Sequence, residues 1–121
     1  MNWSTWQPVS PSVTAETFYD TLANSPAAVL HFWAVWEKYS WSLDVRLQQL
    51  RPVLAPQVDF YSVDVDEEAN WQVCSRYNIQ TTPTLLFFIN GNLRDNFVGL
   101  RSIIELEDRL RLWQKADYEP A

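Results

Sequence analysis

The most informative stretch of this chain is Phe32-Trp33-Ala34-Val35-Trp36-Glu37-Lys38-Tyr39-Ser40. It joins two segments of different pattern. Residues 27–34 are apolar apart from His31, which is typical of a strand buried on both faces of a sheet. Downstream, leucines at 43, 47, 50 and 54 recur at helical spacing, so 36–54 is expected to form a long helix. The aromatic run therefore lies where a buried strand gives way to a helix.

The remaining segments predict a small α/β domain. The chain has 121 residues and is 47% apolar, enough for one domain with its own core. A first helix is expected from a Thr14 cap to about Asn24. A strand over 58–65 and a helix over 67–77 should follow, with Asn78 as a left-handed helix end.

The last part of the chain reads as a hairpin followed by a helix. Asn90-Gly91-Asn92 is a strong turn signal between strands at 84–89 and 93–100. Ser102, with Glu105 three residues later, predicts the capped start of a final helix. The order of elements implies parallel pairing through helical crossovers and then an antiparallel hairpin.

Charge and composition limit the partners. The formal net charge is −6 and the only lysines are Lys38 and Lys115, so binding to nucleic acid is disfavoured. No membrane span and no signal peptide is visible in the sequence, and the expected location is the cytoplasm. One histidine and one cysteine without ligand spacing predict no metal site, and nothing in the sequence calls for a cofactor.

Three stretches together resemble thioredoxins. They are the Phe32-Trp33-Ala34-x-Trp36 run, Tyr77-x-Ile79 followed by Thr82-Pro83-Thr84, and Phe88-x-Asn90-Gly91 followed by Val98-Gly99. The resemblance implies a thioredoxin fold, with a central mixed sheet flanked by helices on both faces and a cis bond before Pro83. It covers roughly 14–115, so we expect an N-terminal arm at 1–13 and a C-terminal tail at 116–121.

The residues that carry the family's chemistry are replaced together. Glu37 and Ser40 stand where the family has the two cysteines of its active site, and Lys38-Tyr39 replaces Gly-Pro between them. Other replaced positions are His31 for a buried Asp, Ser62 for a Lys and Val45 for a Pro that often interrupts the active-site helix. Thiol–disulfide exchange needs a thiolate and a second, resolving thiol. We therefore expect a redox-inactive member of the family that is not an enzyme.

The resemblance also implies where a partner would bind. Thioredoxins hold extended peptides through main-chain hydrogen bonds beside the cis-proline loop, a mode that needs no cysteine. We expect an adaptor, assembly factor or chaperone-like module that binds another protein or an extended peptide. The expected groove residues are Trp36, Glu37, Lys38, Tyr39, Ser40, Thr82, Pro83 and Gly99.

Other interpretations of the same residues stay open. Glu37 and Lys38 also suit a solvated helix start, and Trp36 and Tyr39 suit packing against the N-terminal arm. His31 is expected to be a neutral core histidine, although a Ser40–His31 dyad would permit unrelated enzyme chemistry. Cys74 is expected to be a small buried side chain, with a redox role through this single thiol as the alternative.

Overall fold

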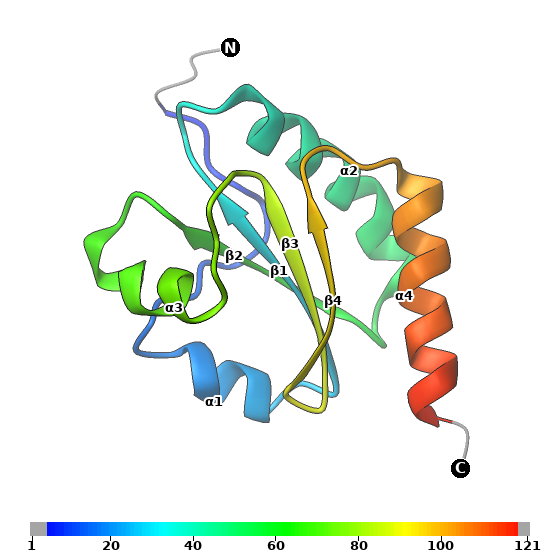
Figure 1. The fold of residues 1–121 in the computed structure, drawn as a ribbon. Helices are drawn as coiled ribbons and strands as arrows, with labels where there is room; N and C mark the ends of the chain where they lie inside the picture. The colour runs from blue at the N-terminus through cyan, green and yellow to red at the C-terminus, as the bar shows by residue number, and fades with distance from the viewer. Residues whose placement is uncertain (1–4, 119–121) are drawn as a thin grey trace.

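The computed structural model describes residues 5–118, and only the backbone of Asp117 and Tyr118. Helices and strands alternate until a final hairpin and helix (Figure 1). Trp3 of the predicted arm and 119–121 of the predicted tail lie outside this range. The elements are α1 (Phe18–Ala23), β1 (Ala27–Trp33), α2 (Lys38–Leu54), β2 (Asp59–Asp64), the 3₁₀ turn η1 (Glu68–Asn70), α3 (Trp71–Arg76), β3 (Thr84–Ile89), β4 (Asn92–Val98) and α4 (Ile103–Tyr118).

The four strands form one mixed sheet in the order β2-β1-β3-β4. β1 pairs with β2 in parallel, and β1–β3 and β3–β4 are antiparallel. Helices α2 and α4 cover one face, and α1 and α3 the other (Figure 1). This mixed sheet with helices on both faces is the thioredoxin fold that the resemblance predicts.

Strand β1 is the centre of the core because both of its faces are covered. All of its residues are buried. Ala27 and Val29 face the cluster that includes leucines of α2 and α4, whereas Leu30 and Phe32 face the cluster that includes Phe18 of α1. The continuous apolar run predicted this double burial.

Two helix predictions need correction. Thr14 does not cap the first helix: its backbone N–H donates to Thr17 Oγ1 (3.2 Å), and α1 begins only at Phe18. The segment predicted as one helix over 67–77 is η1 followed by α3. The reason is the fully buried Asn70, whose amide donates to Asp64 O and accepts from Ala15 N, both at 2.9 Å. These two bonds, of which the one to Ala15 is long-range, hold a tight turn where the local pattern favours a helix.

The predicted turn residues adopt the expected backbone. Asn78 and Asn90 have φ of 53° and 51°, and Gly91 follows with φ of 80°. Asparagine and glycine tolerate this left-handed region better than other residues. Asn78 therefore ends the α3 segment, and Asn90-Gly91 closes the β3–β4 hairpin as predicted.

The N-terminal arm packs along the β2 side of the sheet. Val13 N donates to Ser62 O (2.8 Å), and Ser62 N donates to Pro11 O (2.9 Å). Further out, the Trp6 ring lies 5.0 Å from the Trp33 ring and its indole N–H donates to Val35 O. The described part of the arm thus covers the edge of β2, and its Trp6 lies beside Val35, just before α2.

Candidate functional site

Glu37 is the N-cap of helix α2, whose first helical residue is Lys38. The Glu37 backbone is extended, and its carboxylate accepts from the backbone N–H of Tyr39 (3.0 Å) and of Ser40 (2.8 Å). The first N–H groups of a helix lack a full set of intrahelical acceptors, and a negative charge is favourable at this end. Ser40 N also donates to the Glu37 carbonyl (3.1 Å). Glu37 therefore stabilises the helix start at the position where the resemblance puts the attacking thiol.

We expect Glu37→Ala to lower the free energy of unfolding by about 1 kcal/mol, because the N–H groups of Tyr39 and Ser40 lose the carboxylate that accepts from both. Urea unfolding monitored by tryptophan fluorescence measures this change. Glu37→Asp is the matched control: aspartate is also a favoured cap, so it should retain most of the stability. An alanine variant as stable as the wild type would show that the cap contributes nothing.

Ser40 is fully buried, which corrects its predicted place in the partner groove. Its hydroxyl accepts from Ala34 N (3.2 Å) and lies 3.3 Å from Glu37 Oε2, to which it can donate. The side chain ties the end of β1 to the first turn of α2. Its contribution to the site is to hold this turn.

His31 does not form the dyad that the alternative interpretation required. Its side chain is fully buried, and neither ring nitrogen has a hydrogen-bond partner among the described residues. Ser40 Oγ bonds to Ala34 and Glu37 instead. Burial lowers the pKa of His31 from its ordinary value of 6.5 to about 3, so the ring is neutral at physiological pH.

The loop before β3 is joined to the loop after β4. The Thr82–Pro83 peptide bond is cis, as is Ala55–Pro56. Gly99 N donates to Pro83 O (2.8 Å), and Thr84 Oγ1 donates to Thr81 O (2.8 Å). Because Pro83 itself is buried, it shapes this loop from behind, and Thr81 and Thr82 form its outer surface.

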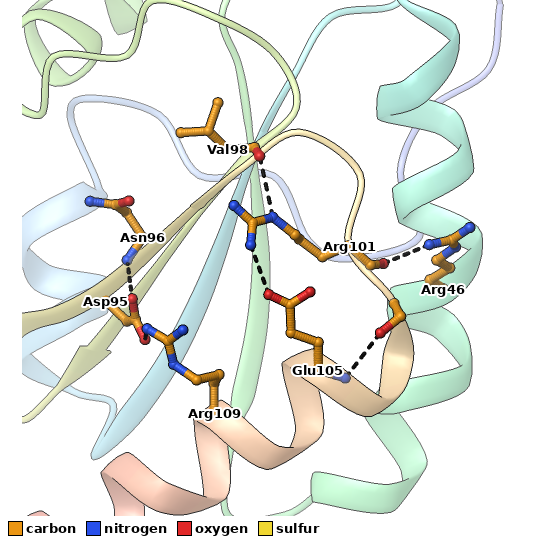
Figure 2. A network of polar contacts seen from close by, with 8 residues as sticks. Arg46, Asp95, Asn96, Val98, Arg101, Glu105 and Arg109 are labelled. Atoms are coloured by element: carbon orange, nitrogen blue, oxygen red, sulfur yellow. Dashed lines mark hydrogen bonds and ion pairs between the residues drawn. The ribbon is translucent and has the colours of Figure 1, made fainter.

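A network of polar contacts fixes the loop that carries Gly99 (Figure 2). Arg101 donates to Val98 O (3.3 Å) and to Glu105 Oε2 (2.7 Å), and its own carbonyl accepts from Arg46 of α2 (2.8 Å). Ser102 Oγ accepts from Glu105 N (3.1 Å), which confirms the predicted serine cap of α4. The loop is thereby attached to α2, β4 and α4 at once.

A groove of about 500 Å3 lies beside these loops. Two large aromatic side chains stand at it, since Trp36 is 67% and Trp71 60% exposed. The groove contains three of the predicted residues, Trp36, Glu37 and Thr82, whereas Lys38, Tyr39 and Gly99 are outside its lining. Its other lining residues are Val65, Trp71, Cys74, Ile79, Gln80 and Thr81.

Tyr39 and Lys38 are exposed next to the groove, at the first turn of α2. Tyr39 is 48% exposed, and Lys38 Nζ lies 5.1 Å from the centre of its ring. Among the described residues, Tyr39 makes no ring contact with the N-terminal arm, whose Trp6 packs on Trp33 instead. An exposed aromatic side chain at a groove rim suits contact with a partner.

Cys74 is only half-buried, which corrects the expectation of a fully buried thiol. α3 is short: Val73 faces the core, and Cys74 beside it faces the groove. Burial raises the pKa of the Cys74 thiol, and the Asp64 carboxylate raises it further. The thiol is therefore accessible from the groove but is poorly ionised at neutral pH.

Over residues 5–118, no group of three or more His, Cys, Asp or Glu side chains is arranged to hold a metal ion. Within the same range, no helix combines the length and the apolar character needed to cross a bilayer.

Comparison with protein families and curated proteins gives consistent matches. The family model described as Thioredoxin matches residues 9–111. Endoplasmic reticulum resident protein 44 of Bos taurus is 33% identical over 113 residues, covering 88% of this chain and 27% of the relative. Thioredoxin of Rickettsia bellii is 31% identical over 101 residues, covering 80% of this chain and 94% of the relative. The chain thus spans about a quarter of the former and nearly all of the latter.

Solved structures show the same fold. The crystal structure of human ERp44 superimposes with a TM-score of 0.77 at 29% identity, covering 90% of this chain and 30% of that one. Mitochondrial thioredoxin 3 from Saccharomyces cerevisiae gives a TM-score of 0.75 at 20% identity, covering 84% of this chain and 93% of that one.

Proposed function

Because this chain belongs to the thioredoxin family but has Cys74 as its single cysteine, we propose that it binds extended polypeptide segments non-covalently. In this role it serves as an adaptor, assembly factor or chaperone-like module and has no dithiol activity. Glu37 and Ser40, at the two positions where the resemblance places cysteines, are both engaged in holding the start of α2.

The observation that carries this proposal is the groove between Trp36 and Trp71. Both indoles are more than half exposed, although burying large apolar side chains is favourable. Tryptophan is the residue type that most often anchors a protein interface. The Gln80–Thr82 segment along the same groove is loop backbone, to which an extended peptide can add main-chain hydrogen bonds.

A second candidate function uses Cys74, because its thiol lines the same groove. Its thiolate would attack a disulfide of a partner, forming a mixed disulfide and releasing the other partner sulfur as a thiol. No second cysteine of this chain could then resolve that intermediate. The raised pKa of the thiol makes this reaction slow at neutral pH, so we favour non-covalent binding.

We expect Trp36→Ala to weaken binding of an extended peptide at least tenfold, because truncating an aromatic anchor typically costs about 2 kcal/mol. The probe is a short, cysteine-free peptide that alternates valine or leucine with serine, titrated by isothermal calorimetry. Tyr39→Ala should weaken binding less, since Tyr39 lies outside the groove lining.

The control for this experiment is Ile104→Ala. Ile104 is 74% exposed on α4, on the opposite face of the sheet, so its loss should leave peptide affinity unchanged. All three variants should keep the wild-type melting temperature, because the replaced side chains are exposed. If Ile104→Ala weakened binding as much as Trp36→Ala, binding would not involve the groove.

A further inference from the structure

Trp36 lies at the third position of a tight turn between β1 and α2. The turn runs over 34–37 and is closed by the bond from Glu37 N to Ala34 O (3.2 Å). Such a bond restrains the two ends of a turn, whereas the central peptide can still rotate from one turn type to another. The central peptide here joins Val35 to Trp36. Its rotation changes the direction in which the Trp36 side chain leaves the backbone.

The Trp36 side chain does little to fix its own orientation. It is 67% exposed, so its indole gains only part of the packing that holds a buried side chain in place. A binding site is tighter when its side chains already stand in the bound orientation, because less freedom is lost on binding. The backbone of the turn must therefore supply most of this preorganisation.

The N-terminal arm makes a hydrogen bond to this central peptide. Trp6 Nε1 donates to Val35 O (2.8 Å). The donor is itself held firmly: Trp6 and Trp33 are 8% and 6% exposed, and their rings lie 5.0 Å apart at an angle of 52°. Aromatic pairs at this separation attract each other beyond the burial of their surface. The bond thus ties the peptide before Trp36 to a buried aromatic pair at the end of β1.

The arm is attached to β2 by separate contacts. Pro8 and Pro11 have no N–H, so the arm cannot form a regular ladder with the strand. Ser62 N donates to Pro11 O (2.9 Å), and Ser62 Oγ donates to Ser10 O (3.0 Å). Figure 1 shows the described arm running from the junction of β1 and α2 along β2 to α1. The bond at the turn can therefore be removed without removing those on β2.

We propose that Trp6 is a positioning residue for peptide binding, whose indole N–H fixes the Val35–Trp36 peptide and thereby the orientation of Trp36 in the groove. This inference rests on the proposed function and gives the arm a role in it. Trp6 is not among the described residues that line the groove, so it acts through Trp36. Without its bond, a smaller fraction of the protein holds Trp36 in the binding orientation, and the apparent affinity falls by that fraction.

The test removes the donor and keeps an aromatic ring. Trp6→Phe can still pack on Trp33 but has no N–H for Val35 O. We expect it to weaken binding of the alternating valine or leucine and serine peptide about fivefold in calorimetric titration, which corresponds to the loss of one hydrogen bond. Ser62→Ala is the matched control, because it removes one hydrogen bond to the arm away from the turn. It should lower the melting temperature by a similar amount and keep the wild-type affinity.

Two further measurements separate positioning from general stability. In protein that already carries Trp36→Ala, adding Trp6→Phe should change the affinity by less than about twofold, because the side chain that it positions is gone. Hydrogen exchange at Glu37 N needs no peptide. It should be faster in Trp6→Phe than in the wild type, since the 34–37 turn opens more often, and unchanged in Ser62→Ala.

Wild-type affinity or wild-type exchange in Trp6→Phe would refute the positioning role, and the groove function would stand as long as Trp36→Ala weakened binding. Equal losses of affinity in Trp6→Phe and Ser62→Ala would also refute it, because they would reflect destabilisation of the arm. The same holds for a full fivefold loss on adding Trp6→Phe to Trp36→Ala. If Trp36→Ala alone left the affinity unchanged, the groove function would fail and this inference with it.

Discussion

Acidification below pH 6.5 is expected to destabilise the native protein by about 1.4 kcal/mol per pH unit through His31 alone. In the unfolded chain His31 takes up a proton near its ordinary pKa of 6.5, whereas burial holds its folded pKa at about 3. Between these values the unfolded state binds more protons, so stability falls as the pH falls. Above 6.5 both states are neutral and the effect vanishes.

Over one to two pH units this loss is a substantial fraction of the stability of a small domain, which is typically about 5–15 kcal/mol. Urea unfolding at about pH 7.5 and about pH 5 measures it, with His31→Leu as the comparison. The difference between wild type and variant isolates His31, because the raised pKa values of Asp44 and Asp64 act in both proteins. The leucine variant should lose much less stability on acidification. Equal losses in the two proteins would mean that His31 is protonated in the folded state.

The second large effect concerns disulfide reduction. We expect no measurable turnover in an insulin-reduction assay under conditions in which a dithiol thioredoxin is fully active. Neither Glu37 nor Ser40 can form a sulfur–sulfur bond, and the lone thiol of Cys74 is poorly ionised. Turnover that disappears in Cys74→Ala would overturn this expectation and establish a redox function for that thiol.

The same assay has a positive control within this chain. Glu37→Cys combined with Ser40→Cys should form an internal disulfide and gain measurable turnover, because Glu37 is the N-cap and Ser40 the third residue of α2, the two positions where the resemblance places cysteines. Glu37→Cys alone lacks the resolving thiol and should gain none. Turnover in the double variant alone would show that the protein lacks only the two cysteines. No turnover in either variant would show that it also lacks the geometry that the cysteines need.

Much of the fold could be predicted because local signals agree with the tertiary structure. The apolar run at 27–34 could only be buried on both faces, and Asn90-Gly91 specifies a tight hairpin. The segment 67–77 could not be predicted as observed. The division of this segment into η1 and α3 depends on the bonds of Asn70 to Ala15 and to Asp64. Such tertiary bonds leave no periodic signal in the sequence.

The site could be predicted only in part. Trp36, Glu37 and Thr82 were found through the resemblance, and all three line the groove. Trp71 and Ile79 were missed because their meeting depends on how α3 lies on the sheet. Spacing did offer one signal, since Trp71 and Cys74 are three residues apart and share a helix face. Ser40 is buried and accepts a hydrogen bond from Ala34 N. The sequence does not reveal this contact between β1 and α2.

The central claim is that a partner is held non-covalently in the Trp36–Trp71 groove. Its most direct test is calorimetric titration of the cysteine-free peptide that alternates valine or leucine with serine into wild-type protein and into Cys74→Ala, each with and without a reducing agent. Non-covalent binding predicts the same affinity in all four titrations, and an affinity at least tenfold weaker when Trp36→Ala is added to either protein. An affinity that survives Trp36→Ala in both proteins would contradict the claim.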